Sequence, residues 1–196
     1  MSDVPVFYAT SEGQTRRICE RIASHLHDHG LDSRAISIRS DEASALDWRR
    51  VRGVVLGASI HMQKHQPEAV AFARRHHQAL SVVPSLFVSV SLAAASKRAS
   101  EVERAREIAE AFPAKAGWCP THVASVAGRL AYTQYNWLVR RIMRRIAVQE
   151  GGSPDMTQDH EYTDWEQVKR FAEALAADIK QRETARASSP GLRAAG

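Results

Sequence analysis

The segment VPVFYATSEGQTRRI, residues 4–18, joins three kinds of sequence in one short stretch. An apolar run ends at Ala9, a cluster of hydroxyl and small residues follows, and a basic segment with helical character comes next. A phosphate at the N-terminus of such a helix would be held by backbone N–H groups, hydroxyls and the helix dipole, and Gly13 would let the backbone approach it closely. An ordinary helix capped by Thr10 or Ser11, with no ligand, is the alternative explanation of the same residues.

The loop lacks the features of the common nucleotide-binding motifs. No Gly-Lys-Ser/Thr sequence follows Gly13, as it would in a P-loop, and no G-x-G-x-x-G sequence is present. The missing lysine and the acidic Glu12 disfavour a polyphosphate held by charge. They fit a single phosphate held mainly by N–H groups and hydroxyls.

Short apolar runs alternate with helical patterns along the chain. The runs are rich in valine without clean polar alternation, which is typical of strands buried on both faces of a parallel sheet. They lie at residues 4–9, 53–58, 84–92 and 121–128, with a weaker alternating run at 33–38. Helices are expected at residues 14–29, 67–80 and 100–112 and from Thr163 onward, the last two with capping boxes at Ser100/Glu103 and Thr163/Glu166. This alternation predicts an α/β fold with a doubly wound parallel sheet and helices on both faces.

Length and composition favour one domain in a reducing compartment. The chain has 196 residues, 44% of them hydrophobic, so a single domain over residues 1–182 is expected, with a disordered tail at 183–196. The two cysteines match no disulfide or metal-binding spacing, which favours the cytoplasm. The start of the chain does not resemble a signal peptide, and no apolar run approaches the roughly 20 residues of a membrane-spanning helix, so a soluble or peripheral protein is expected.

Residues 131–152, AYTQYNWLVRRIMRRIAVQEGG, form the most basic part of the chain. At helical spacing the apolar residues share one side, and the opposite side carries Arg140, Arg141, Arg144 and Arg145. Trp137 falls near the arginines, where an indole suits a membrane interface. A solvated helix face is the alternative, but the like charges destabilise an isolated helix, and an anionic lipid surface would relieve that repulsion. No recognised nucleic-acid-binding motif accompanies the arginines, so nucleic acid is not expected as a partner.

The opening loop resembles the phosphate loop of flavodoxins, T/S-x-T-G-x-T, with Glu12 in place of the usual threonine. The segments SEGQTR, VVLGASI, PSLFVSVSL, VAGRLAYTQYNW and YTDWEQV, in this order, are similar to the quinone-dependent protoporphyrinogen oxidases of bacteria, a branch of the long-chain flavodoxins. The resemblance spans about residues 4–179. It implies a five-stranded parallel sheet in the order 2-1-3-4-5, with the basic helical insert 131–152 at the last strand.

The resemblance implies FMN as the cofactor, and the position of the loops agrees with it. In this strand order a ligand lies at the carboxyl ends of strands one and three, which the loops at residues 10–15 and 57–66 leave. The expected phosphate ligands are Thr10, Ser11, Glu12 (through its backbone), Gly13, Gln14 and Thr15. The flavin ring is expected between Ser59, Ile60 and His61 on one side and Val90, Ser91, Leu92 and Ala93 on the other. We expect no metal site, because His61 and His65 lack a helix and a third ligand.

The function that the resemblance implies is oxidation of protoporphyrinogen IX to protoporphyrin IX in heme biosynthesis, with electrons passed to a membrane quinone, menaquinone or ubiquinone. The basic insert (Trp137 and the four arginines) would contact the anionic cytoplasmic face of the inner membrane or the quinone. Charge alone also makes Arg129 and the insert arginines candidates for binding the substrate's propionates. No general base and no oligomeric state can be named. Three alternatives remain: a flavodoxin electron carrier, which the net charge of +5 disfavours, an NAD(P)H-dependent quinone reductase, and an FMN-free binding module.

Overall fold

The computed structural model describes residues 3–10, 13–130 and 160–188. Its sheet has five parallel strands in the order β2-β1-β3-β5-β6, and the short β4 pairs antiparallel with the end of β3. The six strands are β1 (Val4–Ala9), β2 (Ser33–Ser37), β3 (Val54–His61), β4 (Lys64–His65), β5 (Ser85–Ser91) and β6 (His122–Ala127). The five parallel strands therefore have the predicted 2-1-3-4-5 order, and β4 is an addition that the sequence analysis did not predict.

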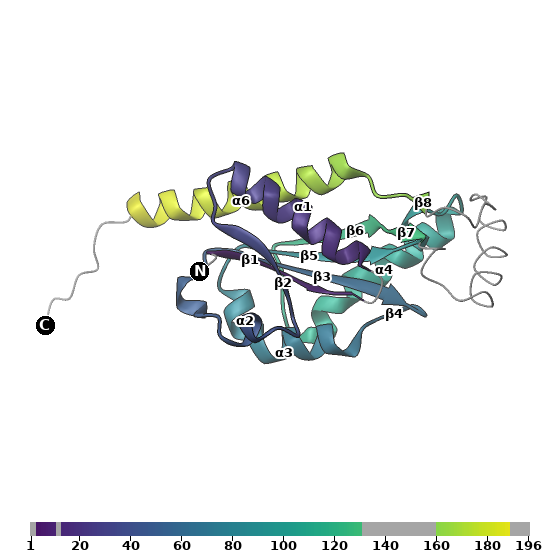
Figure 1. Ribbon diagram of the computed structural model, residues 1–196, viewed down its shortest axis with the longest axis horizontal. Helices are drawn as coiled ribbons and strands as arrows, with labels where there is room; N and C mark the ends of the chain where they lie inside the picture. Colours follow the sequence, from purple (N-terminus) through teal and green to yellow (C-terminus); the bar gives the residue numbers. More distant parts are fainter. Residues whose placement is uncertain (1–2, 11–12, 131–159, 189–196) are drawn as a thin grey trace, which may run out of the picture.

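Helices cover both faces of the sheet (Figure 1). The longer ones are α1 (Gln14–Asp28), α3 (Pro67–Ser81), α4 (Ala99–Ala116) and α6 (Trp165–Ser188), and the short ones are α2 (Asp41–Ser44), η1 (Trp48–Arg50) and η2 (Ala93–Ala95). One hydrophobic cluster joins α1 and α6 to the sheet, through residues such as Ile18 and Leu175. A second cluster, which includes Phe72 and Phe112, joins α3 and α4 to the other face.

The sheet is buried as its valine-rich strands predict. All seven residues of β5 are buried, as are Val54 to Ala58 of β3, because helices lie against both of their faces. The edge strand β2 has only one buried residue, Ile36. Because the five strands run parallel, their carboxyl ends lie at the same edge of the sheet, and the connecting loops meet there.

Two helix starts differ from the expected caps. Helix α4 begins at Ala99, and the residue before it, Arg98, makes no side-chain cap, so the predicted capping box at Ser100 does not form. In front of α6, Asp164 Oδ1 accepts a hydrogen bond from Gln167 N at 2.9 Å. Thr163 does not cap this helix, because its hydroxyl donates to the carbonyl oxygen of Ala127 at 2.8 Å.

Two short segments that lie before and after the predicted insert are paired with each other. Strand β7 (Arg129–Leu130) follows β6 directly and pairs antiparallel with β8 (His160–Glu161) in a separate two-stranded sheet. The segment at residues 159–164 therefore does not resume the parallel strand; its residues 160 and 161 form the return strand of this pair. The predicted basic helix at 131–152, with Trp137, Arg140, Arg141, Arg144 and Arg145, lies outside the described residues.

Helix α6 continues to Ser188, through residues 183–188 that were expected to be disordered. Two side-chain hydroxyls bond back to the preceding turn, from Thr184 to the Lys180 carbonyl at 3.0 Å and from Ser188 to the Thr184 carbonyl at 2.8 Å. Glu183 also pairs with Arg52 before β3. These contacts extend the helix beyond its last buried residue, Ile179.

Candidate flavin site

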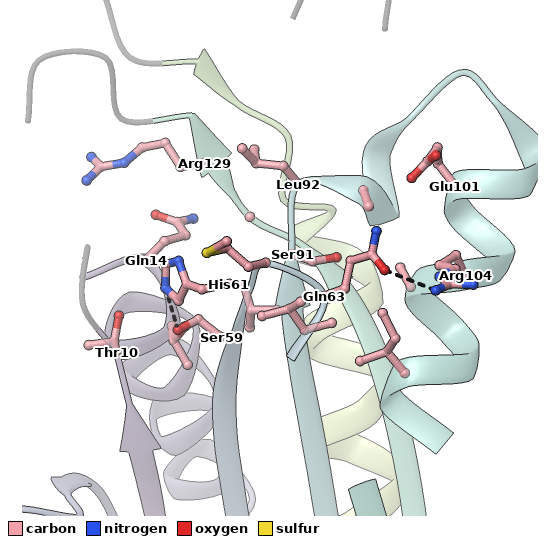
Figure 2. Close-up of a pocket in the computed structure, with 18 residues that line it drawn as sticks. Thr10, Gln14, Ser59, His61, Gln63, Ser91, Leu92, Glu101, Arg104 and Arg129 are labelled. Carbon is pink, nitrogen blue, oxygen red and sulfur yellow. Dashed lines mark hydrogen bonds between the residues drawn. The ribbon is translucent and has the colours of Figure 1, made fainter. Parts of the chain in front are cut away.

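A cavity of about 410 Å³ lies at the carboxyl ends of β1, β3 and β5, where the strand order reverses (Figure 2). Its lining includes ten of the residues predicted to hold the cofactor: Thr10, Gln14, Thr15, Ser59, Ile60, His61, Val90, Ser91, Leu92 and Ala93. The loops that follow three different strands thus converge on one site, as the sequence analysis predicted. Ser11 and Glu12 lie outside the described residues. Gly13 is not among the residues that line the cavity; it lies in the turn before α1.

Gly13 sets the geometry of the loop between β1 and α1. Its φ of 84° is in the left-handed region, which favours glycine, and its N–H donates to Thr10 Oγ1 at 3.0 Å. Helix α1 then begins at Gln14 with no side-chain cap. Thr10 therefore does not cap α1, and the other candidate cap, Ser11, lies outside the described residues. Thr10 stabilises the turn and leaves the N–H groups of the first helical turn available to a ligand.

Two buried polar atoms in this loop have no hydrogen-bond partner among the described residues: Gln14 Oε1 and Thr15 Oγ1. Gln14 is 6% exposed and Thr15 is 1% exposed, so bulk water does not replace the missing bonds. Buried polar groups are rarely left unpaired in folded proteins. Both atoms therefore indicate a ligand that offers a hydrogen-bond donor to the amide oxygen and an acceptor to the hydroxyl.

The Gln14 side chain is fixed by residues near the end of the chain. Its Nε2 donates to Glu161 Oε1 at 3.0 Å and to Thr163 Oγ1 at 2.9 Å, and the other oxygen of Glu161 accepts from Arg17 at 2.9 Å. A flipped amide would place its oxygen against the Glu161 carboxylate, so the orientation of Gln14 is determined. The pair of strands β7 and β8 is thereby attached to the start of α1.

The loop after β3 forms a hairpin beside the cavity. Ser59 Oγ and His61 Nε2 lie 3.2 Å apart, and His61 pairs with Lys64 across a two-residue turn made by Met62 and Gln63. Both turn residues have positive φ, 48° and 62°, as a two-residue hairpin turn of the primed type requires. Neither is glycine, so this turn stores backbone strain at the edge of the site.

The loop after β5 forms the opposite wall. Val90 and Ser91 are buried, while Leu92 and Ala93 are partly exposed. The Ser91 hydroxyl accepts from Ala94 N at 3.2 Å, and its carbonyl accepts from Gly128 N at 3.0 Å. These bonds fix the loop against the end of β6.

Helix α4 contributes lining residues that the sequence analysis missed. Glu101, Arg104, Ala105 and Ile108 face the cavity, as do Met62 and Gln63 of the hairpin turn and Gly128 and Arg129 after β6. The four α4 residues have the spacing of one helix face. That spacing was visible in the sequence, but nothing in it indicated that this face turns toward the strand ends.

His65 is partly buried against the core and is not among the residues that line the cavity. Its ring packs edge-on against Phe87 and Phe112, with centroids 5.3 and 5.0 Å away, and Nε2 lies 2.9 Å from Ser89 Oγ. Burial, assisted by the charge of Lys115, lowers the pKa of His65 to about 4, so the imidazole is neutral at neutral pH. Within the described ranges, no three His, Cys, Asp or Glu side chains are grouped to hold a metal ion.

The sheet order and the cavity define a flavodoxin-like protein, and comparisons with known proteins agree. Residues 5–157 match the family described as "Flavodoxin domain", so the fold is that of a flavin-binding domain. The flavodoxin of Megasphaera elsdenii, in its two-electron reduced solution structure, superposes with a TM-score of 0.52 at 12% identity, covering 89% of this chain and 98% of that one. At this identity the superposition supports the fold alone.

Two curated relatives identify the family to which the chain belongs among flavodoxin-like proteins. Protoporphyrinogen IX dehydrogenase [quinone] of Escherichia coli (strain K12) is 32% identical over 171 residues, which cover 87% of this chain and 93% of the relative. The protein of the same name from Leishmania major is 32% identical over 174 residues, covering 88% of this chain and 74% of the relative. The chain belongs to the family of quinone-type protoporphyrinogen IX dehydrogenases, as its sequence motifs predicted.

No helix in the described part of the chain is long and apolar enough to cross a membrane.

Proposed function

We propose that this protein oxidises protoporphyrinogen IX to protoporphyrin IX in heme biosynthesis, with FMN as its cofactor and a membrane quinone as the electron acceptor. The observation that carries the proposal is the match to the Escherichia coli relative of that name over 87% of the chain and 93% of the relative. The cavity at the switch point supports it, since three loops meet there as a flavin requires.

The residues of the β1–α1 loop fit the phosphate and sugar alcohol of FMN. The unpaired Thr15 hydroxyl can donate to a phosphate oxygen, together with the N–H groups of the first turn of α1. The unpaired Gln14 Oε1 can accept from a ribityl hydroxyl. Thr10 and Gly13 shape the turn, and Ser11 and the backbone of Glu12 complete the proposed phosphate site.

The two walls of the cavity are proposed to hold the flavin ring between them. Ser59, Ile60 and His61 form one wall, and the other consists of Val90, Ser91, Leu92 and Ala93. Bound FMN would supply the two-electron chemistry, and complete oxidation of a porphyrinogen takes about three such transfers. The apolar side chains Ile60, Val90 and Leu92 exclude water from the ring, and the Ser59 and His61 pair offers polar atoms to its edge.

The insert at residues 131–152 is proposed to bring the protein to the quinone. Its side chains Trp137, Arg140, Arg141, Arg144 and Arg145 would rest on the anionic cytoplasmic face of the inner membrane, at about 1 kcal/mol for each basic residue. Replacing the four arginines with glutamine should lower binding to anionic vesicles and turnover with membrane quinone, while FMN stays bound. Arg182→Gln with Arg186→Gln, outside the insert, is the matched control. Unchanged vesicle binding in the fourfold variant would contradict this role.

Anaerobic reduction of the purified holoprotein tests the reaction. Protoporphyrinogen IX should bleach the flavin absorption and NADH should not, and added quinone should restore the absorption. Bleaching by NADH alone would favour the flavodoxin-like quinone reductase. If neither protoporphyrinogen IX nor NADH bleached the flavin and a reduced redox protein did, the result would favour the electron carrier.

A further inference from the structure

The cavity extends beyond the two walls proposed for the flavin, toward helix α4. Figure 2 shows Arg104 and Gln63 on one side of the cavity, with Thr10 and Gln14 on the other and Ser91 between them. We call the region formed by Met62, Gln63, Glu101, Arg104, Ala105 and Ile108 the α4 side. Its residues are not needed for the proposed cofactor contacts.

Arg104 forms no ion pair with an acidic side chain in the described part of the chain. Its guanidinium donates to the neutral amide oxygen of Gln63 at 3.0 Å, and in the described ranges no carboxylate oxygen lies within 4.0 Å of it. Arg106, two positions along the same helix, is different: it pairs with Glu103 at 2.6 Å and with Glu110 at 3.2 Å. Both arginines are exposed, but Arg104 lines the cavity and is available to an anion, whereas Arg106 is already paired.

The surroundings of Arg104 specify what kind of anion fits. Met62, Ala105 and Ile108 supply apolar surface on the α4 side, where Glu101 and Gln63 are the other polar residues. A planar guanidinium binds a carboxylate through two parallel hydrogen bonds. The ligand that matches is a large apolar molecule with a peripheral carboxylate.

The other cavity arginine, Arg129, belongs to the opposite side. It lies across from Glu161 in the β7–β8 pair, and Glu161 contacts Gln14 of the proposed phosphate site. Figure 2 shows Arg129 on the same side of the cavity as Gln14 and Thr10, the side of the proposed phosphate site. This leaves Arg104 to serve a second ligand.

We propose that Arg104 binds a propionate carboxylate of the porphyrinogen, and that Gln63 is a positioning residue that orients the guanidinium. This inference rests on the proposed function for the identity of the ligand. The macrocycle would then lie along the α4 side against Met62 and Ile108, beside the flavin ring. A quinone has no carboxylate for the two parallel hydrogen bonds, so this interaction separates the substrate from the electron acceptor.

The test uses FMN-loaded wild type, Arg104→Gln and the matched control Arg106→Gln. Fluorescence titration in detergent gives the Kd of protoporphyrin IX and of its dimethyl ester, and steady-state assays give KM for the porphyrinogen and the quinone. Arg104→Gln should weaken binding of the diacid and raise the porphyrinogen KM about tenfold, because a charge-assisted hydrogen bond is lost. Its affinity for the diester and its quinone KM should not change, and Arg106→Gln should match wild type throughout.

Equal weakening of diacid and diester binding, or no change in either, would overturn the assignment. If Arg104→Gln does not fold, Gln63→Ala leaves the helix intact and should weaken diacid binding about threefold, with no effect on the diester. Wild type that binds the diacid through Arg104 but does not oxidise the porphyrinogen would disprove the proposed function and keep this inference. If Arg104→Gln left the oxidation of the porphyrinogen unchanged, the proposed function would stand and this inference would be disproved.

Discussion

The two sides of the cavity are built in opposite ways. On the phosphate side, formed by Thr10, Gly13, Gln14 and Thr15 with Glu161 and Thr163 behind them, Gln14 and Thr15 are buried and the Gln14 amide nitrogen already has two acceptors. Of the buried side-chain atoms on this side, only Gln14 Oε1 and Thr15 Oγ1 lack a partner among the described residues. On the α4 side, Met62 is 96% exposed, the turn beneath it is strained, and Arg104 has only a neutral partner. A prearranged, buried site suits a group that stays bound, whereas an exposed charge on an apolar wall suits a ligand that enters and leaves.

Gly57→Ala should have the largest effect, and it should fall on the phosphate side. An added Cβ would lie 2.5 Å from Cys19 Sγ and 3.2 Å from Thr15 Cγ2, and β3 cannot retreat because it pairs with β1 and β5. Helix α1 must shift, which should cost about 1–3 kcal/mol of unfolding free energy and weaken FMN binding at least about tenfold. Urea denaturation and flavin fluorescence titration measure the two effects.

Gly30→Ala is the control for this substitution. Unlike Gly57, Gly30 has a positive φ, 81°, and an added Cβ there meets no atom within 4 Å. It should lower stability by about 1 kcal/mol and leave the FMN affinity unchanged. FMN affinity in Gly57→Ala equal to that of wild type would show that the start of α1 is not held as described.

Acid should disturb the α4 side through His65. Its folded pKa, about 4, is below the unfolded value of 6.5, so the unfolded state binds more protons between these values. Stability should fall as the pH decreases through this window, by about 2 kcal/mol between pH 7.5 and 5, and His65→Gln should remove that part of the pH dependence. His65 follows the hairpin turn, so the porphyrinogen KM should rise before FMN is lost. If the stability of His65→Gln depended on pH as that of wild type does, His65 would not be the group responsible.

Thr163→Val should weaken the phosphate side by a smaller amount. The variant leaves the Ala127 carbonyl without its donor and Gln14 Nε2 without one of its two acceptors. We expect a loss of about 1–2 kcal/mol in stability and an FMN affinity about fivefold lower. Thr184→Val is the control, because its hydroxyl bonds only within α6 at an exposed site. Equal effects of the two substitutions would show that Thr163 does not support Gln14.

Met62→Gly should have the smallest effect, and with the opposite sign. Glycine adopts a φ of 48° without the steric cost that methionine has there, so the unfolding free energy should rise by up to about 1 kcal/mol. The loss of the apolar side chain should raise the porphyrinogen KM at the same time. Lower stability in this variant would mean that the exposed methionine stabilises the turn.

The two sides also differ in how far the sequence predicted them. The phosphate side follows from local sequence, since a strand, a glycine turn and a helix N-terminus are adjacent in the chain. Thr10, Gln14 and Thr15 line the cavity at this turn, and their role as phosphate ligands stays a prediction. The α4 side depends on the angle at which α4 packs on the sheet, and α4 begins more than thirty residues after the end of β3. No local pattern encodes that angle, so Arg104 and Ile108 were missed.

Similar reasons explain the smaller differences. The helix start at α6 was placed one residue early because Thr163 and Asp164 are both good caps, and only the tertiary bond from Thr163 to Ala127 selects between them. Strand β8 was ambiguous because its partner, β7, lies on the far side of the insert. No pattern in the sequence indicates the hydrogen bond between Glu161 of β8 and Gln14.

Paired titrations of Thr15→Val and Arg104→Gln test the division of the cavity most directly. FMN affinity is measured for both proteins, and the affinity for protoporphyrin IX is then measured at saturating FMN. Thr15→Val should bind FMN about tenfold more weakly and the porphyrin as wild type does, and Arg104→Gln should show the reverse. If either substitution weakened both ligands equally, the cavity would not have separate sides for cofactor and substrate.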